Sequence, residues 1–299
     1  MMELIKDTKI DFIGLRKTAF IISAILVLIG ILSFVMISLG KANLSIDFTG
    51  GTNVQVRFSD RVDIGDVRKA LESGGISDVQ IQEVSGTRDF FIKTKLSDTE
   101  KESVSARITG ILSAQLKGAK FELLGSNMVG PGVGKSLKKY AIIAIVLALL
   151  GIIIYIAWRF TFVSGIAATI ATFHDVLVIC GVFYFLGKEF NLLIITALLT
   201  IAGYSLQDTV VVFDRIRENS AKMKSRDDFG NIINASVNEV LSRTIVTGIS
   251  TLICLAAIMI FGGDVLFDFA FALFLGLIVG TYSSIFVASP IVYAWRKRI

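Results

Sequence analysis

Ionisable side chains stand inside three of the long apolar stretches of this sequence. Asp208 stands between two apolar stretches and lies six residues before Asp214, which places it about 9 Å deeper along a helix. Arg243 opens the next apolar stretch, and His174-Asp175, which contains the only histidine, stands in the middle of another. A charged side chain within a membrane span is costly unless it is paired or hydrated. These residues therefore indicate a functional site.

A buried carboxylate with an arginine opposite it has the chemistry of a proton relay. Desolvation allows the carboxylate to exist either neutral or charged, and a nearby cation favours the charged form. We therefore predict that Asp208 and Arg243 form such a relay. The supporting polar residues are expected to be Gln207, Thr209, His174 and Asp175.

Two of these groups also have simpler interpretations. Arg243 lies near the end of its apolar stretch, so its side chain can instead snorkel to the lipid headgroups. His174 and Asp175 also suit an inert polar clamp between helices. The sequence does not decide between the clamp and a functional role.

The composition requires a membrane to hold these residues. Of 299 residues 54% are hydrophobic and 18% are charged, against about 25% charged in soluble domains. This excludes an ordinary soluble fold, a disordered chain and a disulfide scaffold. The net charge of +5 comes without a basic run interleaved with aromatics, so nucleic acid is not expected. Cys180 and Cys254 lie in apolar runs without metal-ligand spacing, so we interpret them as packing residues and expect no metal and no cofactor. No enzymatic activity is expected either.

Six stretches are long and apolar enough to cross a bilayer, which takes about 20 residues per helix. They cover residues 18–39, 140–158, 161–186, 191–213, 244–262 and 265–295. The first is interpreted as an uncleaved anchor, and the last is long enough to be tilted or partly interfacial. The last five form a bundle within residues 140–299. Residues 214–243 are expected to form a cytoplasmic loop with an interfacial helix whose Ile232, Ile233, Ser236 and Val240 face the bilayer.

The basic residues set the orientation. The N-terminal segment 1–17, Arg159, the loop 214–243 and the C-terminal tail together carry 14 Lys and Arg residues, whereas the opposite short loops carry only Lys188. Because short cytoplasmic loops are enriched in Lys and Arg, both termini are predicted to be cytoplasmic. Residues 40–139 then lie outside.

The external block 40–139 alternates strand and helix patterns. Strands are predicted at 53–58, 79–84, 89–96 and 120–124, with helices at 64–71 and 101–116 and a turn at 85–87. The order βαββαβ is that of the ferredoxin-like fold. The glycine-rich segment 130–136 lacks the first glycine of a phosphate-binding loop, since residue 129 is Val. We interpret Gly130, Pro131, Gly132 and Gly134 as a hinge.

The last span carries small residues at every fourth position. They are Ala272, Gly276, Gly280, Ser284 and Ala288. Such a ridge allows close helix packing, which we expect to be against another chain or half.

Several motifs along the whole chain resemble the SecF family, the smaller half of the SecD–SecF export apparatus and a relative of the resistance–nodulation–division exporters. They are Asp47-Phe48-Thr49-Gly50-Gly51-Thr52, Val129-Gly130-Pro131, His174-Asp175, Gly203-Tyr204-Ser205, Asp214-Arg215-Ile216-Arg217-Glu218-Asn219, Leu241-Ser242-Arg243-Thr244 and Gly280-Thr281-Tyr282-Ser283-Ser284-Ile285.

The resemblance implies a six-span subunit of the bacterial cytoplasmic (inner) membrane that pairs with SecD. The pair would work beside the SecYEG channel on translocating preprotein, in contact with membrane lipid and with YajC and YidC as further candidate partners. The proton-motive force would drive late steps of export, and the residues matching Asp208 and Arg243 would form the proton pathway. The family usually has Asn where this chain has Gln207.

Two other functions are also consistent with the sequence. One is a stand-alone proton-coupled exporter of small molecules that works as a dimer, since such exporters generally carry twelve spans per chain. The other is a purely structural subunit, in which apolar residues could replace Asp208 and Arg243 without loss. Proton or sodium coupling, the stoichiometry with SecD, the effect of Gln207 and the source organism are left open by the sequence.

Overall fold

A computed structural model describes residues 8–39, 41–77, 79–83, 87–95, 103–116, 118–222 and 228–296. It divides into two compact units, a helical unit of residues 1–43 and 144–299 and an α/β unit of residues 44–143. Parts of several predictions fall outside the described residues. They are the start of the N-terminal segment, most of the turn at 85–87, the last residue of the strands 79–84 and 89–96, the start of the helix 101–116, residues 223–227 of the cytoplasmic loop, and residues 297–299.

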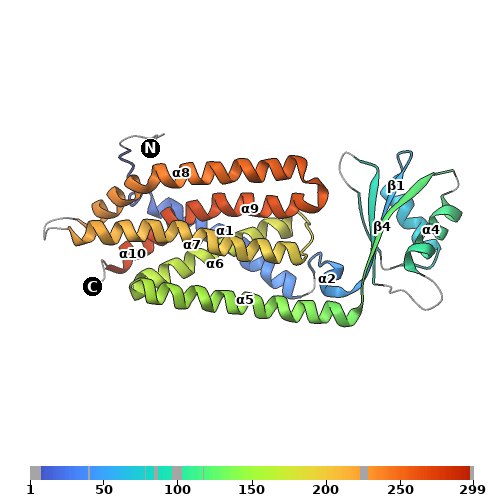
Figure 1. Ribbon diagram of the computed structural model, residues 1–299, viewed down its shortest axis with the longest axis horizontal. Coiled ribbons are helices and arrows are strands. Elements are labelled where there is room, and N and C mark those ends of the chain that lie inside the picture. Colours follow the sequence, from blue (N-terminus) through green and yellow to red (C-terminus); the bar gives the residue numbers. More distant parts are fainter. Residues whose placement is uncertain are drawn as a thin grey trace. The chain divides into compact units, whose positions relative to one another are not determined.

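The described residues contain six helices long and apolar enough to cross a membrane, as predicted. They are α1 (Arg16–Ser38), α5 (Pro131–Arg159), α6 (Phe162–Phe185), α7 (Leu192–Ala221), α8 (Phe229–Phe261) and α9 (Gly263–Ser283) (Figure 1). The last continues through a π-helical turn, η1 (Ser284–Ala288), into α10 (Ser289–Arg296). Thr161 and Asn191 fix the starts of α6 and α7, because each side chain accepts a hydrogen bond from a backbone N–H of the first turn.

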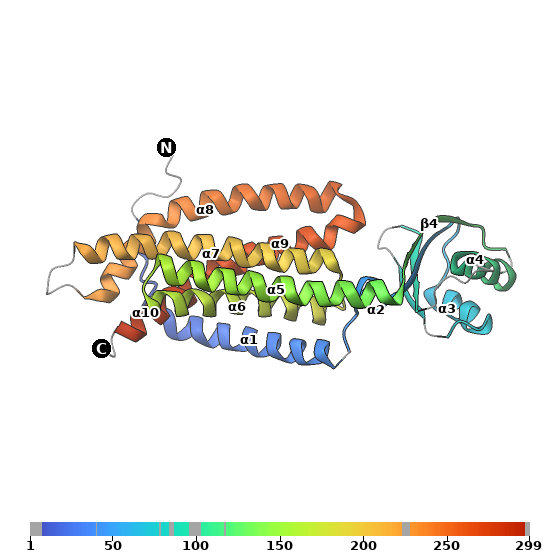
Figure 2. The ribbon, with the colours of Figure 1, turned by 60° about the horizontal axis from the view of Figure 1, so that its bottom comes forward.

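The helical unit has inner and outer helices. In α6, α7 and the α9–α10 span, half or more of the apolar segment is buried, whereas in α1, α5 and α8 less than a fifth is. Figure 2 shows α6, α7 and α9 running along one another, and each packs against the other two. Polar residues on α6, α7 and α9 are therefore shielded by protein. The apolar surfaces of α1, α5 and α8 are left for lipid or another protein.

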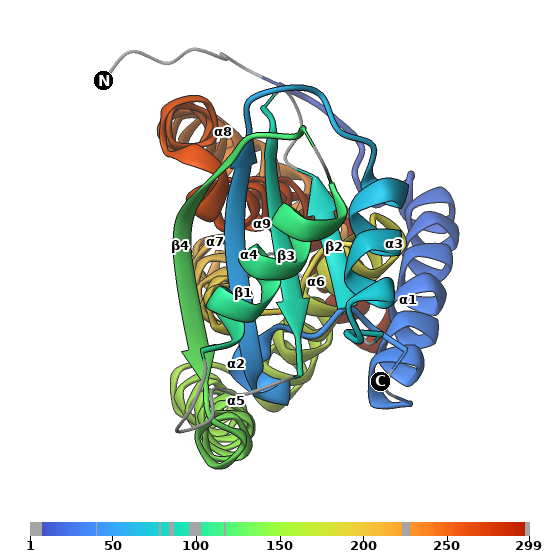
Figure 3. The same cartoon turned by 90° about the vertical axis from the view of Figure 1, so that its right-hand side faces the viewer.

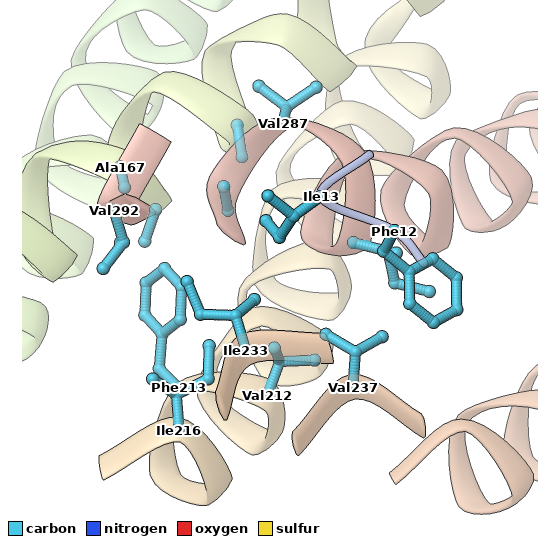
Figure 4. Close-up of a cluster of buried hydrophobic side chains, with 14 of the residues drawn as sticks. Phe12, Ile13, Ala167, Val212, Phe213, Ile216, Ile233, Val237, Val287 and Val292 are labelled. Carbon is cyan, nitrogen blue, oxygen red and sulfur yellow. The ribbon is translucent and has the colours of Figure 1, made fainter. Parts of the chain in front are cut away.

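The N-terminal segment closes one end of the helical unit. Phe12 and Ile13 belong to a single buried cluster with Phe213 of α7, Ile233 of α8 and Val292 of α10 (Figure 4). On the same segment, the Asn238 side chain accepts from the Ile10 N–H at 3.1 Å and donates to the Ile10 carbonyl at 2.9 Å, while Asn234 accepts from the Ile13 N–H. Two asparagines one helical turn apart thus bind the backbone of the N-terminal segment at Ile10 and Ile13.

This packing corrects the interpretation of residues 214–243. The structure has no separate interfacial helix among the described residues there: α7 runs on to Ala221 and α8 begins at Phe229. Ile233 and Ser236 are fully buried in protein, and do not face a bilayer. The reason is the N-terminal segment, which covers the apolar side of α8, while Arg215 and Glu239 pair across α7 and α8.

The α/β unit has the predicted order. It comprises α2 (Ile46–Thr49), β1 (Gly51–Phe58), α3 (Ile64–Ser73), β2 (Val79–Glu83), β3 (Asp89–Thr94), α4 (Val104–Gln115) and β4 (Phe121–Val129). The strands pair antiparallel in the order β2-β3-β1-β4, with α3 and α4 on one face (Figure 3). Val54, Phe58, Ile92, Leu71 and Ile108 form the core between sheet and helices. The ferredoxin-like prediction is confirmed.

The glycine-rich segment has a packing role that the sequence did not indicate. Pro131, Gly132 and Gly134 lie in the first turn of α5, and not in a loop. A Cβ on Gly134 would stand 2.8 Å from the backbone nitrogen of Gly50, whereas one on Gly132 would meet nothing within 4 Å. Gly50 itself has a φ of +72° and no room for a side chain against Pro131. The glycines therefore allow two backbones to touch, and the hinge stays a prediction.

Candidate functional site

Asp175 is the centre of a polar cluster that joins the three inner helices. Its Oδ1 lies 2.8 Å from Nδ1 of His174 on the same helix, α6. Its Oδ2 accepts hydrogen bonds from Ser205 of α7 and from Ser283 of α9, the latter at 2.7 Å. The Asp175 side chain is fully buried, and both serines are at most 1% exposed. Two serine hydroxyls and the imidazole of His174 therefore satisfy one carboxyl group in an apolar interior.

A second set of hydroxyls continues this cluster towards the π-helical turn. Thr209 Oγ1 and Ser284 Oγ share a hydrogen bond of 2.8 Å, and Thr209 also donates to the carbonyl of Ser205. Ser284 is the first residue of η1, and its carbonyl accepts from the Ser289 hydroxyl at 2.9 Å. Serine side chains thus satisfy backbone groups where the helix widens. π-helical turns are frequent at functional sites.

Asp208 stands beside this cluster on α7. The residue is 7% exposed, and its Oδ2 accepts a hydrogen bond from Thr281 of α9 at 3.2 Å. Arg243 is the one cation near enough to act on this carboxylate among the residues described. Asp208 therefore has a hydroxyl partner and a positive charge at longer range.

The predicted direct pairing of Asp208 with Arg243 is not present in the structure. No ion pair of 4.0 Å or less joins them in the described part of the chain, and the Arg243 side chain is exposed on the surface of α8. Their roles as a relay are not tested by this arrangement. Gln207 is exposed on another face of α7, whereas Thr209, His174 and Asp175 are buried together. The structure thus groups three of the four supporting residues and leaves Gln207 apart.

The small-residue ridge is explained by packing within the chain. All five of its residues are buried. A Cβ on Gly276 would stand 2.4 Å from the Ile201 side chain, and one on Gly280 would stand 3.1 Å from Cβ of Ser205. The ridge therefore seats α9 on α7, and the expectation that it packs against another chain or half is wrong. Close approach here is what allows Ser283 to reach Asp175.

Three residues of the site were missed in the sequence. Ser205, Thr281 and Ser283 provide hydroxyl donors to the two buried carboxylates. Their spacing was a usable signal, because Ser205 precedes Asp208 by three residues and Thr209 by four, which puts them on one side of a helix.

Charged residues at the helix ends differ from those of the cluster. Arg159 pairs with Asp214 at 2.7 Å, and Lys188 pairs with Asp268 at 2.7 Å, each with both side chains partly exposed. These aspartates have a full cationic partner. The hydrogen-bond partners of Asp175 and Asp208 are instead hydroxyls and a histidine. Among the described residues no group of His, Cys, Asp and Glu suits a metal ion.

Comparison with known families identifies the chain. A model of the C-terminal region of the protein export membrane proteins SecD and SecF matches residues 111–298, and one of the SecD/SecF GG motif matches residues 41–60. The chain belongs to the SecD/SecF family. The GG motif contains Gly50 and Gly51, the glycines that touch the first turn of α5 and β3 in this structure.

Several relatives are SecF proteins that match over nearly their whole length. The SecF subunit of Thermodesulfovibrio yellowstonii is 48% identical over 299 residues, covering all of this chain and 98% of the relative. SecF of Pseudomonas aeruginosa is 36% identical over 291 residues, covering 97% and 92%. Both are protein translocase subunits, which places this SecF-like chain in protein translocation as a multi-pass membrane protein.

A solved structure has the same fold. The crystal structure of SecDF from Thermus thermophilus, a translocon-associated membrane protein, superposes with a TM-score of 0.85 at 37% identity. The match covers 98% of this chain and 39% of the SecDF chain. In that relative the part similar to SecF is thus less than half of one longer polypeptide.

Proposed function

We propose that this chain pairs with SecD and uses the proton-motive force to drive late steps of preprotein export. The observation that carries the proposal is Asp208. It is a carboxylate inside an apolar bundle, with one hydroxyl donor and a cation, Arg243, that is near but not bound. The charged carboxylate of Asp208 attracts the Arg243 cation, whereas the protonated, neutral carboxyl needs no cationic partner.

The energy of one proton is sufficient for this role. Moving an elementary charge through 100 mV yields about 2.3 kcal/mol. At room temperature this shifts a conformational equilibrium about 50-fold. In the proposed cycle a charged Asp208 attracts Arg243 and draws α7 and α8 together, and protonation releases them. The α/β unit would transmit the motion to the preprotein.

The pairing with SecD is supported by two observations. The Thermus thermophilus relative is a SecDF, of which this chain corresponds to 39%. The helices α1, α5 and α8 also leave apolar faces uncovered in this chain alone. We further propose that the protein lies in the cytoplasmic membrane with both termini inside. It would work with SecYEG and the preprotein, and with YajC and YidC as further candidate partners. Its role would be that of a transport subunit and not of an enzyme.

The test replaces Asp208 by Asn in cells that depend on this gene. We expect Asp208→Asn to slow gradient-dependent export and growth to the level of a deletion, because the amide cannot exchange a proton. Asp268→Asn is the matched control, since Asp268 is an end-of-helix carboxylate paired with Lys188, and it should leave export unchanged. Normal export in Asp208→Asn contradicts the proposal.

Isolation of the protein from its native membrane tests the pairing. Mild detergent extraction followed by identification of the bound chains should recover SecD together with this chain. Recovery of a homodimer without SecD would instead support the small-molecule exporter.

A further inference from the structure

The His174–Asp175 pair contains one nitrogen without a partner. His174 is 3% exposed, and its Nδ1 is engaged by Asp175, yet Nε2 is buried with no hydrogen-bond partner in the described part of the chain. Buried polar atoms are almost always satisfied, so an exception requires a reason. The side chain lies too deep for another protein to reach it. Water or a proton fits such a position.

We propose that His174 and Asp175 form a second proton-binding site that takes up a proton at Nε2 of His174. The inference rests on the proposed function, because it assigns the proton as the coupling ion of the same inner helices. In the unloaded state the carboxylate accepts the Nδ1–H of a neutral imidazole, which leaves Nε2 as a base. Uptake of a proton from water gives an imidazolium beside a carboxylate, so the pair then has no net charge. Release reverses the step.

Apart from Asp175, no ionisable side chain among the described residues forms a hydrogen bond with His174. On α6 the nearest other ionisable residues are Cys180 and Tyr184, and α1 has none between residues 18 and 38. Tyr282 of α9 has its ring centroid 6.2 Å from that of His174, but its hydroxyl donates to the Ala19 carbonyl of α1.

The other helices around α6 contribute groups that are engaged elsewhere. Asp208 of α7 stands one turn beyond Ser205 and accepts from Thr281. η1 has no ionisable residue, while Tyr293 and Arg296 of α10 contact Arg16 and Phe229. None of these described groups bonds to Nε2 of His174.

The geometry also selects the ion. Both oxygens of Asp175 are already taken, Oδ1 by His174 and Oδ2 by two serine hydroxyls. Hard cations such as Na⁺ take oxygen ligands, whereas the free atom here is an imidazole nitrogen. A sodium ion would have to compete with these hydrogen bonds for the carboxylate oxygens, whereas a proton on Nε2 breaks none of them. The site therefore favours protons over sodium.

Proton uptake by the His174–Asp175 pair would change the contacts between α6, α7 and α9. The same Oδ2 that balances the imidazole holds Ser205 of α7 and Ser283 of α9. A change of charge on His174 alters how strongly Asp175 accepts from these hydroxyls. Ser283 directly precedes η1, so the pair can bias the π-helical turn at which α9 ends.

The only histidine in the chain makes a direct test possible. The full complex, labelled with ¹⁵N-histidine in this subunit and placed in lipid bilayers, is titrated from pH 5 to 9 by solid-state NMR. We expect Nε2 to change from unprotonated to protonated with one midpoint in this range, while Nδ1 stays protonated. In Asp175→Asn the Nδ1 signal should change, because the carboxylate that Nδ1 contacts is lost. Asp268→Asn should leave it unchanged. An Nε2 signal that does not move with pH overturns the proposal.

Export measurements separate this inference from the proposed function. His174→Asn keeps an amide donor near Asp175 but cannot take up a proton, so we expect gradient-driven export to be lost although the protein stays folded. If Asp208→Asn exports normally, the proposed function fails whatever His174 does. If Asp208→Asn is inactive and Nε2 of His174 does not titrate, only the second site fails.

Discussion

Removal of the two serine hydroxyls that share Oδ2 of Asp175 should destabilise the helical unit by more than the sum of the single changes. In Ser205→Ala or Ser283→Ala the carboxylate keeps the other hydroxyl and His174, so only one hydrogen bond is lost. Interhelical hydrogen bonds in membrane proteins contribute about 0.6 kcal/mol on average and up to about 1.7 kcal/mol. Because these bonds are charge-assisted and buried, we expect about 1 kcal/mol for each single variant.

The double variant leaves Oδ2 buried without any donor. The desolvation cost of an unsatisfied buried group is then added, about 1–3 kcal/mol. We therefore expect the free energy of unfolding to fall by about 3 kcal/mol or more, which is a coupling of about 1 kcal/mol between the two sites. Alanine adds no atom at either position, so the closely packed surface between α7 and α9 stays intact.

Equilibrium unfolding in mixed detergent micelles measures these free energies, with helix content as the signal. Ser250→Ala is the control, because the Ser250 hydroxyl is exposed and bonds only to the Val246 carbonyl of its own helix. It should change the unfolding free energy by less than about 0.5 kcal/mol. If the double variant is strictly additive and each single variant resembles Ser250→Ala, the Asp175 cluster does not hold the helices together.

Three further predictions concern other parts of the chain. Gly134→Ala should lower the free energy of unfolding by about 1–3 kcal/mol, because the added Cβ would overlap the backbone nitrogen of Gly50. Gly132→Ala should raise it by about 0.5–1 kcal/mol, because a Cβ there meets no atom within 4 Å; thermal unfolding measures both changes. The Arg57 guanidinium, which donates two hydrogen bonds, lowers the pKa of Asp89 from its ordinary 3.8. The stability that this pair adds to the α/β unit should be complete above about pH 4 and lost as the pH falls through the lowered pKa of Asp89. Arg57→Met should remove this pH dependence from acid unfolding curves. Asn238→Ala loses both hydrogen bonds to the N-terminal segment and should speed amide exchange at its Ile10, a result that an unchanged exchange rate would contradict.

Local patterns were sufficient to predict most of the fold. The six spans and the βαββαβ order follow from hydrophobic periodicity, which is set by neighbours three, four or two residues away. The prediction for residues 214–243 was wrong because such patterns contain only near neighbours in the sequence. The amphipathic pattern there indicates an interfacial helix whose apolar side faces the bilayer, but Phe12 and Ile13, more than 200 residues earlier, bury the apolar side of α8. No local pattern contains that contact.

The charged residues of the site could be predicted from the sequence, but their hydrogen-bond partners could not. Asp208, Arg243 and Asp175 are visible because a charge in an apolar run is rare. That Asp175 binds Ser205 and Ser283 depends on how deeply α9 sits on α7, which Gly276 and Gly280 decide. The sequence showed that ridge but not the helix it packs on. Likewise the π-helical turn at Ser284 has no composition signal, and only the backbone reveals it.

Proton movement during export is the measurement that most directly tests the role of Asp208. The SecD-containing complex is reconstituted with the channel into proteoliposomes that carry a pH gradient and an internal pH-sensitive dye. We predict preprotein-dependent proton entry in the unmodified complex and in Asp268→Asn, and none in Asp208→Asn. Equal proton entry in Asp208→Asn would contradict it.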